Sequence, residues 1–87
     1  GDTEPTVVVK PQYVDGKVAF VINAEDDEKI TKIEITHNGG EKQVIDVNDT
    51  KFQKNIIMTT GETNTLIVTV TNLNGLTKTS RVKFDNK

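Results

Sequence analysis

The stretch from Gly61 to Gly75 constrains the fold more than any other part of the chain. Leu66, Val68 and Val70 occupy every second position in it, so a strand would carry all three side chains on one face. Asn74-Gly75 follows, and both residue types accept the positive φ angle that a tight hairpin turn needs. The stretch therefore predicts a strand followed by the turn of a β-hairpin.

The composition extends this prediction to the whole chain. Val, Ile and Thr together number 32 of the 87 residues, whereas Ala and Leu together number 5. β-Branched side chains lose little rotamer freedom on a pleated sheet and more in a helix, so these proportions favour strands. A chain of this length forms one domain and no more. We expect a single all-β domain over residues 6–87, preceded by a linker over residues 1–5.

Alternating segments separated by turn residues predict seven strands. The expected strands are Thr6–Lys10, Lys17–Asn23, Ile30–His37, Lys42–Val47, Lys51–Thr59, Asn64–Asn72 and Leu76–Phe84. Pro11 cannot donate to a hydrogen-bond ladder, so we expect it to break the first strand at a sheet edge. The polar run over residues 25–29 is expected to cross between two sheets. Turn signals at intervals of roughly 8–12 residues fit a seven-stranded, two-sheet Ig-like β-sandwich, with a small closed barrel as the alternative.

Two groups of residues resemble a known family. The first group is Val18, Phe20, Ile22, Ala24 and Asp26, followed by Ile30, Ile33, Glu34, Ile35, Asn38 and Gly39. The second is Phe52, Lys54, Ile56, Met58, Gly61, Asn64, Thr65, Leu66, Val68, Val70, Asn72 and Gly75. Together they resemble the bacterial Ig-like domains of Gram-positive surface proteins, adhesins and secreted hydrolases, over residues 6–84. Asn72 is a departure, because such domains often carry Asp at that point.

The resemblance implies a function as well as a fold. It implies a non-catalytic structural or spacer module of a secreted or cell-wall-attached bacterial protein, often in tandem copies. The partners would be neighbouring domains of the parent chain, and any export signal or wall anchor would lie outside this sequence. The alternative is an adhesin-type module that recognises a host or cell-wall protein or a glycan. The paired Cys and Trp of antibody domains are absent from the sequence.

Several other functions are not expected from this composition. The chain has no Cys, a net charge of −2 and no Lys/Arg cluster interleaved with aromatic residues, so we expect no disulfide and no nucleic-acid partner. Since no apolar run approaches about 18 residues, we expect no membrane insertion. His37 is the only histidine, and we interpret it as a half-buried residue at a strand end. We therefore expect no enzymatic activity.

The acidic run Glu25-Asp26-Asp27-Glu28 is the candidate metal site. Calcium takes six to eight oxygen ligands from carboxylates, amides and carbonyls. Asn72 or Asn74 would add an amide oxygen if the two loops share one end of the domain. The alternative interpretation is a solvated charge run between strands. No other cofactor is expected.

Three further features carry weaker hypotheses. An outward row of hydroxyls would form a face for protein or sugar, and it comprises Thr65, Thr69, Thr71, Thr77 and Thr79. The alternative is that Thr is simply a good solvent-facing strand residue. Alternation turns Ala19, Val21, Ile57 and Ile67 away from the expected core, which would give a shallow apolar patch if their strands are neighbours. Lys10 and Asn86 have the chain order of a Lys–Asn isopeptide cross-link.

Overall fold

The computed structural model describes residues 3–15, 17–58 and 62–86. Its strands are β1 (Thr6–Val14), β2 (Lys17–His37), β3 (Gln43–Met58), β4 (Glu62–Asn72) and β5 (Thr77–Asn86). These described ranges contain no helix, and therefore none long and apolar enough to cross a membrane. The prediction of an all-β protein is confirmed.

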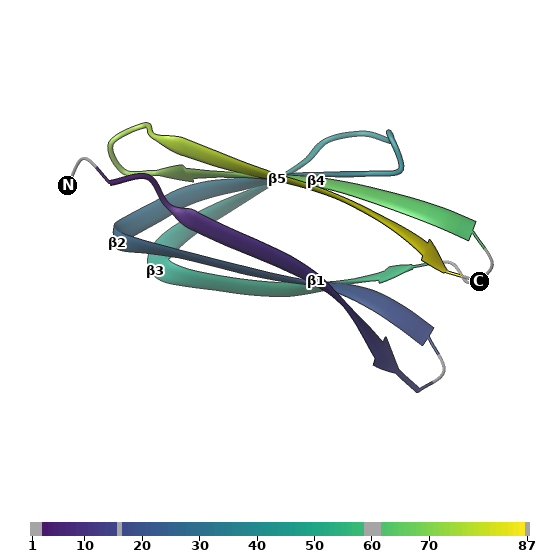
Figure 1. Ribbon diagram of the computed structural model, residues 1–87. Coiled ribbons are helices and arrows are strands. Elements are labelled where there is room, and N and C mark those ends of the chain that lie inside the picture. Colours follow the sequence, from purple (N-terminus) through teal and green to yellow (C-terminus); the bar gives the residue numbers. More distant parts are fainter. Residues whose placement is uncertain (1–2, 16, 59–61, 87) are drawn as a thin grey trace.

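β2 organises the sheet. Every pairing is antiparallel, and β2 pairs with β1, β3 and β4. β1 pairs with residues 17–25 of β2 and β4 with residues 30–37, whereas β3 pairs with both halves. β5 pairs with β4. The product is one curled antiparallel sheet in which β4 and β5 lie over β1 and the first half of β2 (Figure 1).

The curl originates where the strand register shifts. The pairing of β2 with β3 shifts between Glu25 and Ile30 and again between Ile30 and Lys32. Such irregularities let a strand change direction while it stays in the sheet. The expected crossing over residues 25–29 is part of β2 rather than a separate loop, although residues 26–29 have no partner in the register of β2 with β3. Asn48-Asp49 likewise lies inside β3, so the structure has five long strands where seven short ones were expected.

The expected end of the first strand is also wrong. β1 continues through Pro11, which lies opposite Phe20, as far as Val14. In the described residues β1 pairs with β2 alone, so Pro11 is on an edge strand, where a missing N–H is tolerated. Asp15 lies in the turn between β1 and β2 and has a φ of 50°. Gly16 lies outside the described residues, as does Gly61 of the resemblance.

The core fills the inside of the curl. Its buried members are Val9, Val18, Phe20, Ile22, Ala24, Ile30, Ile33, Ile35, Leu66, Val68 and Val70. Half-buried residues packed against them include Ile45, Val47, Phe52, Ile56, Val82 and Phe84. Alternation predicted the inward faces at Val18–Ala24 and Leu66–Val70 correctly. It fails at Ile30, which has the parity of Lys32 and Glu34 but is buried, because the register shifts between Ile30 and Lys32. The side chain of Met58 is outside the described part. Ala19 differs from expectation, because it is buried between Gln12 and Ile57 on the neighbouring strands.

Truncating the core should destabilise the domain far more than truncating its surface. Phe20 is 0% exposed, and Phe20→Ala should cost about 3–5 kcal/mol of unfolding free energy through the cavity it leaves. The matched control is Ile57→Ala, at 57% exposure, which should cost less than about 1 kcal/mol. Urea unfolding followed by circular dichroism measures both. Equal losses in the two variants would contradict the core assignment.

Candidate functional site

Asn72 connects three parts of the chain at one end of the domain. It is the last residue of β4 and is 2% exposed. Its side-chain N–H₂ group donates to the backbone O of Thr3 at 3.0 Å and to Oδ1 of Asp26 at 3.1 Å. Its Oδ1 accepts from the backbone N–H groups of Asn74 at 3.0 Å and Leu76 at 2.9 Å. All four hydrogen-bonding positions of this buried amide are therefore used.

The acidic run meets the β4–β5 turn at the same place, as the sequence hypothesis required. Asp26 Oδ1 accepts from Asn72, and Asp26 Oδ2 accepts from the backbone N–H of Glu28 at 3.0 Å. Asn74 donates its side-chain N–H to Glu28 Oε1 at 3.3 Å. The structure thus brings Asp26, Glu28, Asn72 and Asn74 together. Glu25 and Asp27 alternate with the first two and are solvent-exposed.

This cluster does not have the geometry of a calcium site. Both oxygens of Asp26 accept hydrogen bonds from protein N–H groups, and so does Oε1 of Glu28. The Asn72 oxygen faces the backbone of its own turn. Among the described residues, no three Asp, Glu or His side chains lie close enough together to hold a metal ion. Calcium binding would therefore require the acidic side chains to move closer together, and the calcium hypothesis is open to a direct test.

A second buried amide, that of Asn64, lies near the start of β4. Asn64 is 0% exposed, and its Oδ1 accepts from Asn38 Nδ2 at 2.9 Å and lies 3.1 Å from His37 Nε2. Asn38 in turn has a φ of 53°, and its Oδ1 accepts from the backbone N–H of Thr65 at 2.8 Å. His37 is half-buried at the end of β2, as predicted. These contacts fix the end of β2 to the start of β4.

Sequence analysis missed the role of these two amides. Asn64 and Asn72 have the same parity as Leu66, Val68 and Val70, so alternation places all five on the inward face of β4. A buried amide must be hydrogen-bonded, because an unsatisfied polar group costs about 1–3 kcal/mol. This parity is the signal that would have identified both residues as inward-facing polar groups.

The weaker hypotheses have separate outcomes. Thr69 and Thr79 lie opposite each other and their hydroxyls are 2.9 Å apart, while Thr71 pairs with Thr77. The hydroxyl of Thr71 is buried, so it does not belong to the expected outward row. The expected apolar patch does not form as one surface. Ala19 pairs with Ile57 on β3, whereas Ile67 on β4 pairs with Thr36 and Arg81.

The isopeptide hypothesis requires a buried lysine. Lys10 is exposed on β1, opposite Val21, which is an unsuitable environment for such a cross-link. The side chain of Asn86 lies outside the described part of the structure.

Comparison with known proteins does not assign the chain to a family. No protein-family model matches the sequence, and neither the curated proteins nor the solved structures gave a significant match. The resemblance to bacterial Ig-like domains stays a prediction that rests on the residues given above. Functional argument must therefore rest on the geometry of this chain.

Exchanging the Asn72 amide for a carboxylate should destabilise the domain. Asn72→Asp removes both donors and places a negative charge beside Asp26, so the unfolding free energy should fall by about 2–4 kcal/mol at neutral pH. Burial and the neighbouring charge raise the pKa of the new carboxyl in the folded state above its unfolded value. The decrease in unfolding free energy should have its full size above that folded pKa. It should become smaller as the pH falls through this pKa.

The matched control for this experiment is Asn55→Asp, which makes the same substitution at an exposed position of β3. It should change the unfolding free energy by less than about 0.5 kcal/mol. Urea unfolding at several pH values measures both variants. A loss for Asn72→Asp that does not depend on pH would contradict the assigned environment.

Calcium should leave the thermal stability of the domain unchanged, because no three acidic side chains of the described residues lie close enough together to hold the ion. A melt with about 2 mM calcium is compared with one in chelator, and magnesium at equal concentration controls for ionic strength. A site with a dissociation constant near 20 µM would add about 2.7 kcal/mol and raise the Tm by several degrees. Such a rise, specific to calcium, would contradict the expectation and support a site at residues 25–28.

Proposed function

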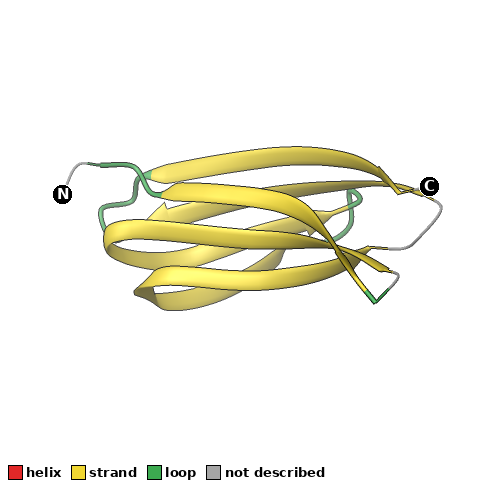
Figure 2. Cartoon of the chain, turned by 60° about the horizontal axis from the view of Figure 1, so that its bottom comes forward, coloured by secondary structure: helices red, strands yellow, loops and turns green. Residues whose placement is uncertain are grey.

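We propose that the chain folds as an Ig-like β-sandwich and serves as a non-catalytic spacer module in a secreted or cell-wall-attached bacterial protein. The observation that carries this proposal is the position of the outer strands. β1 begins at one end of the long axis and β5 ends at the other (Figures 1 and 2). The domain measures 42 × 23 × 18 Å along its principal axes. Domains joined through these ends would extend along their longest dimension.

The strand register supports the sandwich interpretation. Residues 17–25 of β2 have β1 on one side and residues 51–58 of β3 on the other. Residues 30–37 of β2 have β4 on one side and residues 43–49 of β3 on the other. If each half of β2 and β3 is counted as a strand, the chain has the seven segments of the expected fold, divided between two layers. The apolar core lies between these layers.

The attachment of the N-terminal segment supports a spacer that holds its neighbours in a fixed direction. Thr3 and Pro5 fall within the expected linker, yet Pro5 is buried and the Thr3 carbonyl accepts a hydrogen bond from Asn72. The chain therefore enters the domain along a defined path rather than as a free tether. A neighbour attached here would inherit that direction.

A tandem of three copies, joined directly, tests the proposal by small-angle X-ray scattering. We expect a rod-like profile with a maximum dimension of about three times the 42 Å length of one domain. The control is the same tandem with about ten Gly/Ser residues inserted at each junction, because such linkers behave as flexible coils. If the direct tandem scatters like the control, or is more compact, the spacer proposal is contradicted.

A further inference from the structure

β5 presents a free edge of the sheet. Within the described residues it pairs with β4 alone. The backbone N–H of Asn72 donates to the O of Leu76, so these two residues form a hydrogen-bonded pair. Along the hairpin, such pairs alternate with pairs that are not hydrogen-bonded to each other, beginning with Thr71 and Thr77. In an antiparallel ladder the residues of the intervening pairs direct their N–H and C=O groups outward. The outward residues of β5 are therefore Thr77, Thr79, Arg81, Lys83 and Asp85.

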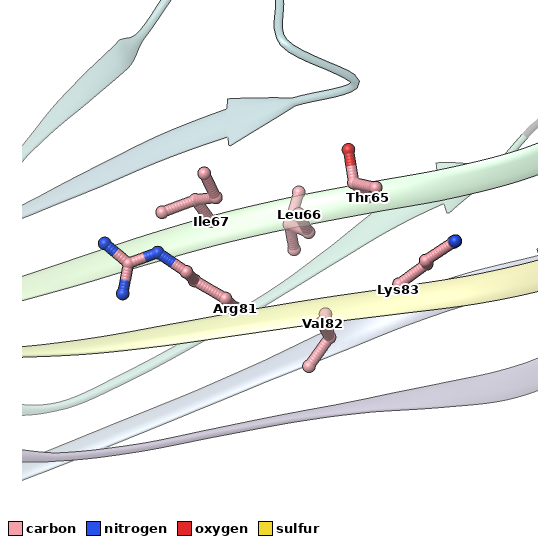
Figure 3. Close-up of a pocket in the computed structure, with 6 residues that line it drawn as sticks. All are labelled: Thr65, Leu66, Ile67, Arg81, Val82 and Lys83. Carbon is pink, nitrogen blue, oxygen red and sulfur yellow. The ribbon is translucent and has the colours of Figure 1, made fainter.

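The side chains of these residues form one surface with β4. Arg81 lies opposite Ile67, and Lys83 lies opposite Thr65, around a shallow hollow of about 350 Å³ (Figure 3). Ile67 is 38% exposed, which is a large exposure for an isoleucine on a sheet face. We call Thr65, Ile67, Arg81 and Lys83 the β4–β5 surface.

The two cations of the β4–β5 surface have no anionic partner in the described part of the chain. Asp85 is the next residue of this face after Lys83, and its side chain lies outside the described part of the structure. Among the acids whose side chains are described, Glu34 on β2 contacts Lys42 at 3.1 Å and Lys32 at 4.0 Å instead. The surface therefore combines an exposed apolar side chain, two positive charges and an open hydrogen-bonding edge.

We propose that an acidic, extended segment of a partner protein adds to β5 as a further strand. Its backbone would pair with the outward groups of β5, and acidic side chains at alternate positions would face Arg81 and Lys83. Charge favours this occupant over a second copy of the chain. Two β5 edges paired with Arg81 opposite Arg81 or Lys83 of the other copy would bring these cations close to each other, which is unfavourable. This binding goes beyond the spacer function and does not depend on it.

The probe is a fluorescein-labelled peptide of alternating Glu and Val, with binding followed by fluorescence anisotropy at low ionic strength. The intact domain should bind it, and the double variant R81E/K83E should bind at least tenfold more weakly. The matched control is K10E/K17E, which makes the same change in net charge with exposed residues of β1 and β2. Its affinity should stay within about twofold of the wild-type value once added salt screens the general effect of net charge.

A third variant tests the backbone pairing independently of charge. Thr79→Pro removes an outward N–H while leaving the ladder to β4 complete, so the domain should keep its circular dichroism spectrum. We expect it to bind the peptide at least tenfold more weakly although both cations are present. Wild-type affinity in this variant would overturn strand addition.

The remaining outcomes also decide the question. Equal losses in R81E/K83E and K10E/K17E would overturn the proposal in favour of general attraction between opposite charges. Failure of the wild-type domain to bind the peptide would overturn it as well. So would binding of heparin in place of the peptide, since that result would assign the surface to an anionic glycan.

Discussion

The fold depends on the hydrogen bonding of one strand along its whole length. β2 pairs with β1, β3 and β4, and within residues 3–15, 17–58 and 62–86 only the β4–β5 pairing does not involve it. Its first half supplies Phe20 and Ile22 to the core and its second half supplies Ile33 and Ile35. The register shifts between these halves bring the two sets of side chains face to face. Without that bend, a chain so rich in β-branched residues would form a flat sheet with one apolar face exposed.

Two buried amides secure the ends of the structure that the apolar core leaves open. Asn64 fixes the end of β2 to the start of β4, and Asn72 fixes the bend of β2 and the N-terminal segment to the β4–β5 turn. A hydrogen bond contributes only about 1 kcal/mol net, but an amide that loses its partners inside the protein costs more. These residues therefore favour one register of β4 over any slipped pairing, which would leave both amides unsatisfied.

The sequence predicted the side-chain directions better than the strand boundaries. Alternation at Val18–Ala24 and Leu66–Val70 is a local property, so the inward faces were predicted correctly. Whether the chain turns away at residues 25–29 or continues as the same strand depends on how the flanking residues Glu25 and Ile30 pair with β3, a segment distant in sequence, which no local pattern reports. For the same reason Pro11 was expected to end a strand that its edge position allows to continue.

The candidate site was predictable in part. The calcium hypothesis required the acidic run to lie at the same end of the domain as Asn72 and Asn74, and the structure places them together. The direction of each amide was not predictable, because it depends on whether the Thr3 carbonyl and the turn N–H groups are within reach. The open edge of β5 likewise follows from the order of the strands in the sheet rather than from the composition of β5.

The arrangement of the outer strands has a mechanical consequence. Tension applied between the start of β1 and the end of β5 acts along both strands, because each lies lengthwise in the domain (Figure 1). β1 is paired with β2 from Thr6 to Val14, and β5 with β4 from Thr77 to Asn86. Ladder hydrogen bonds run perpendicular to the strands, so this force shears the bonds of a ladder together instead of breaking them one at a time. The domain is therefore arranged to resist stretching along the line from the start of β1 to the end of β5.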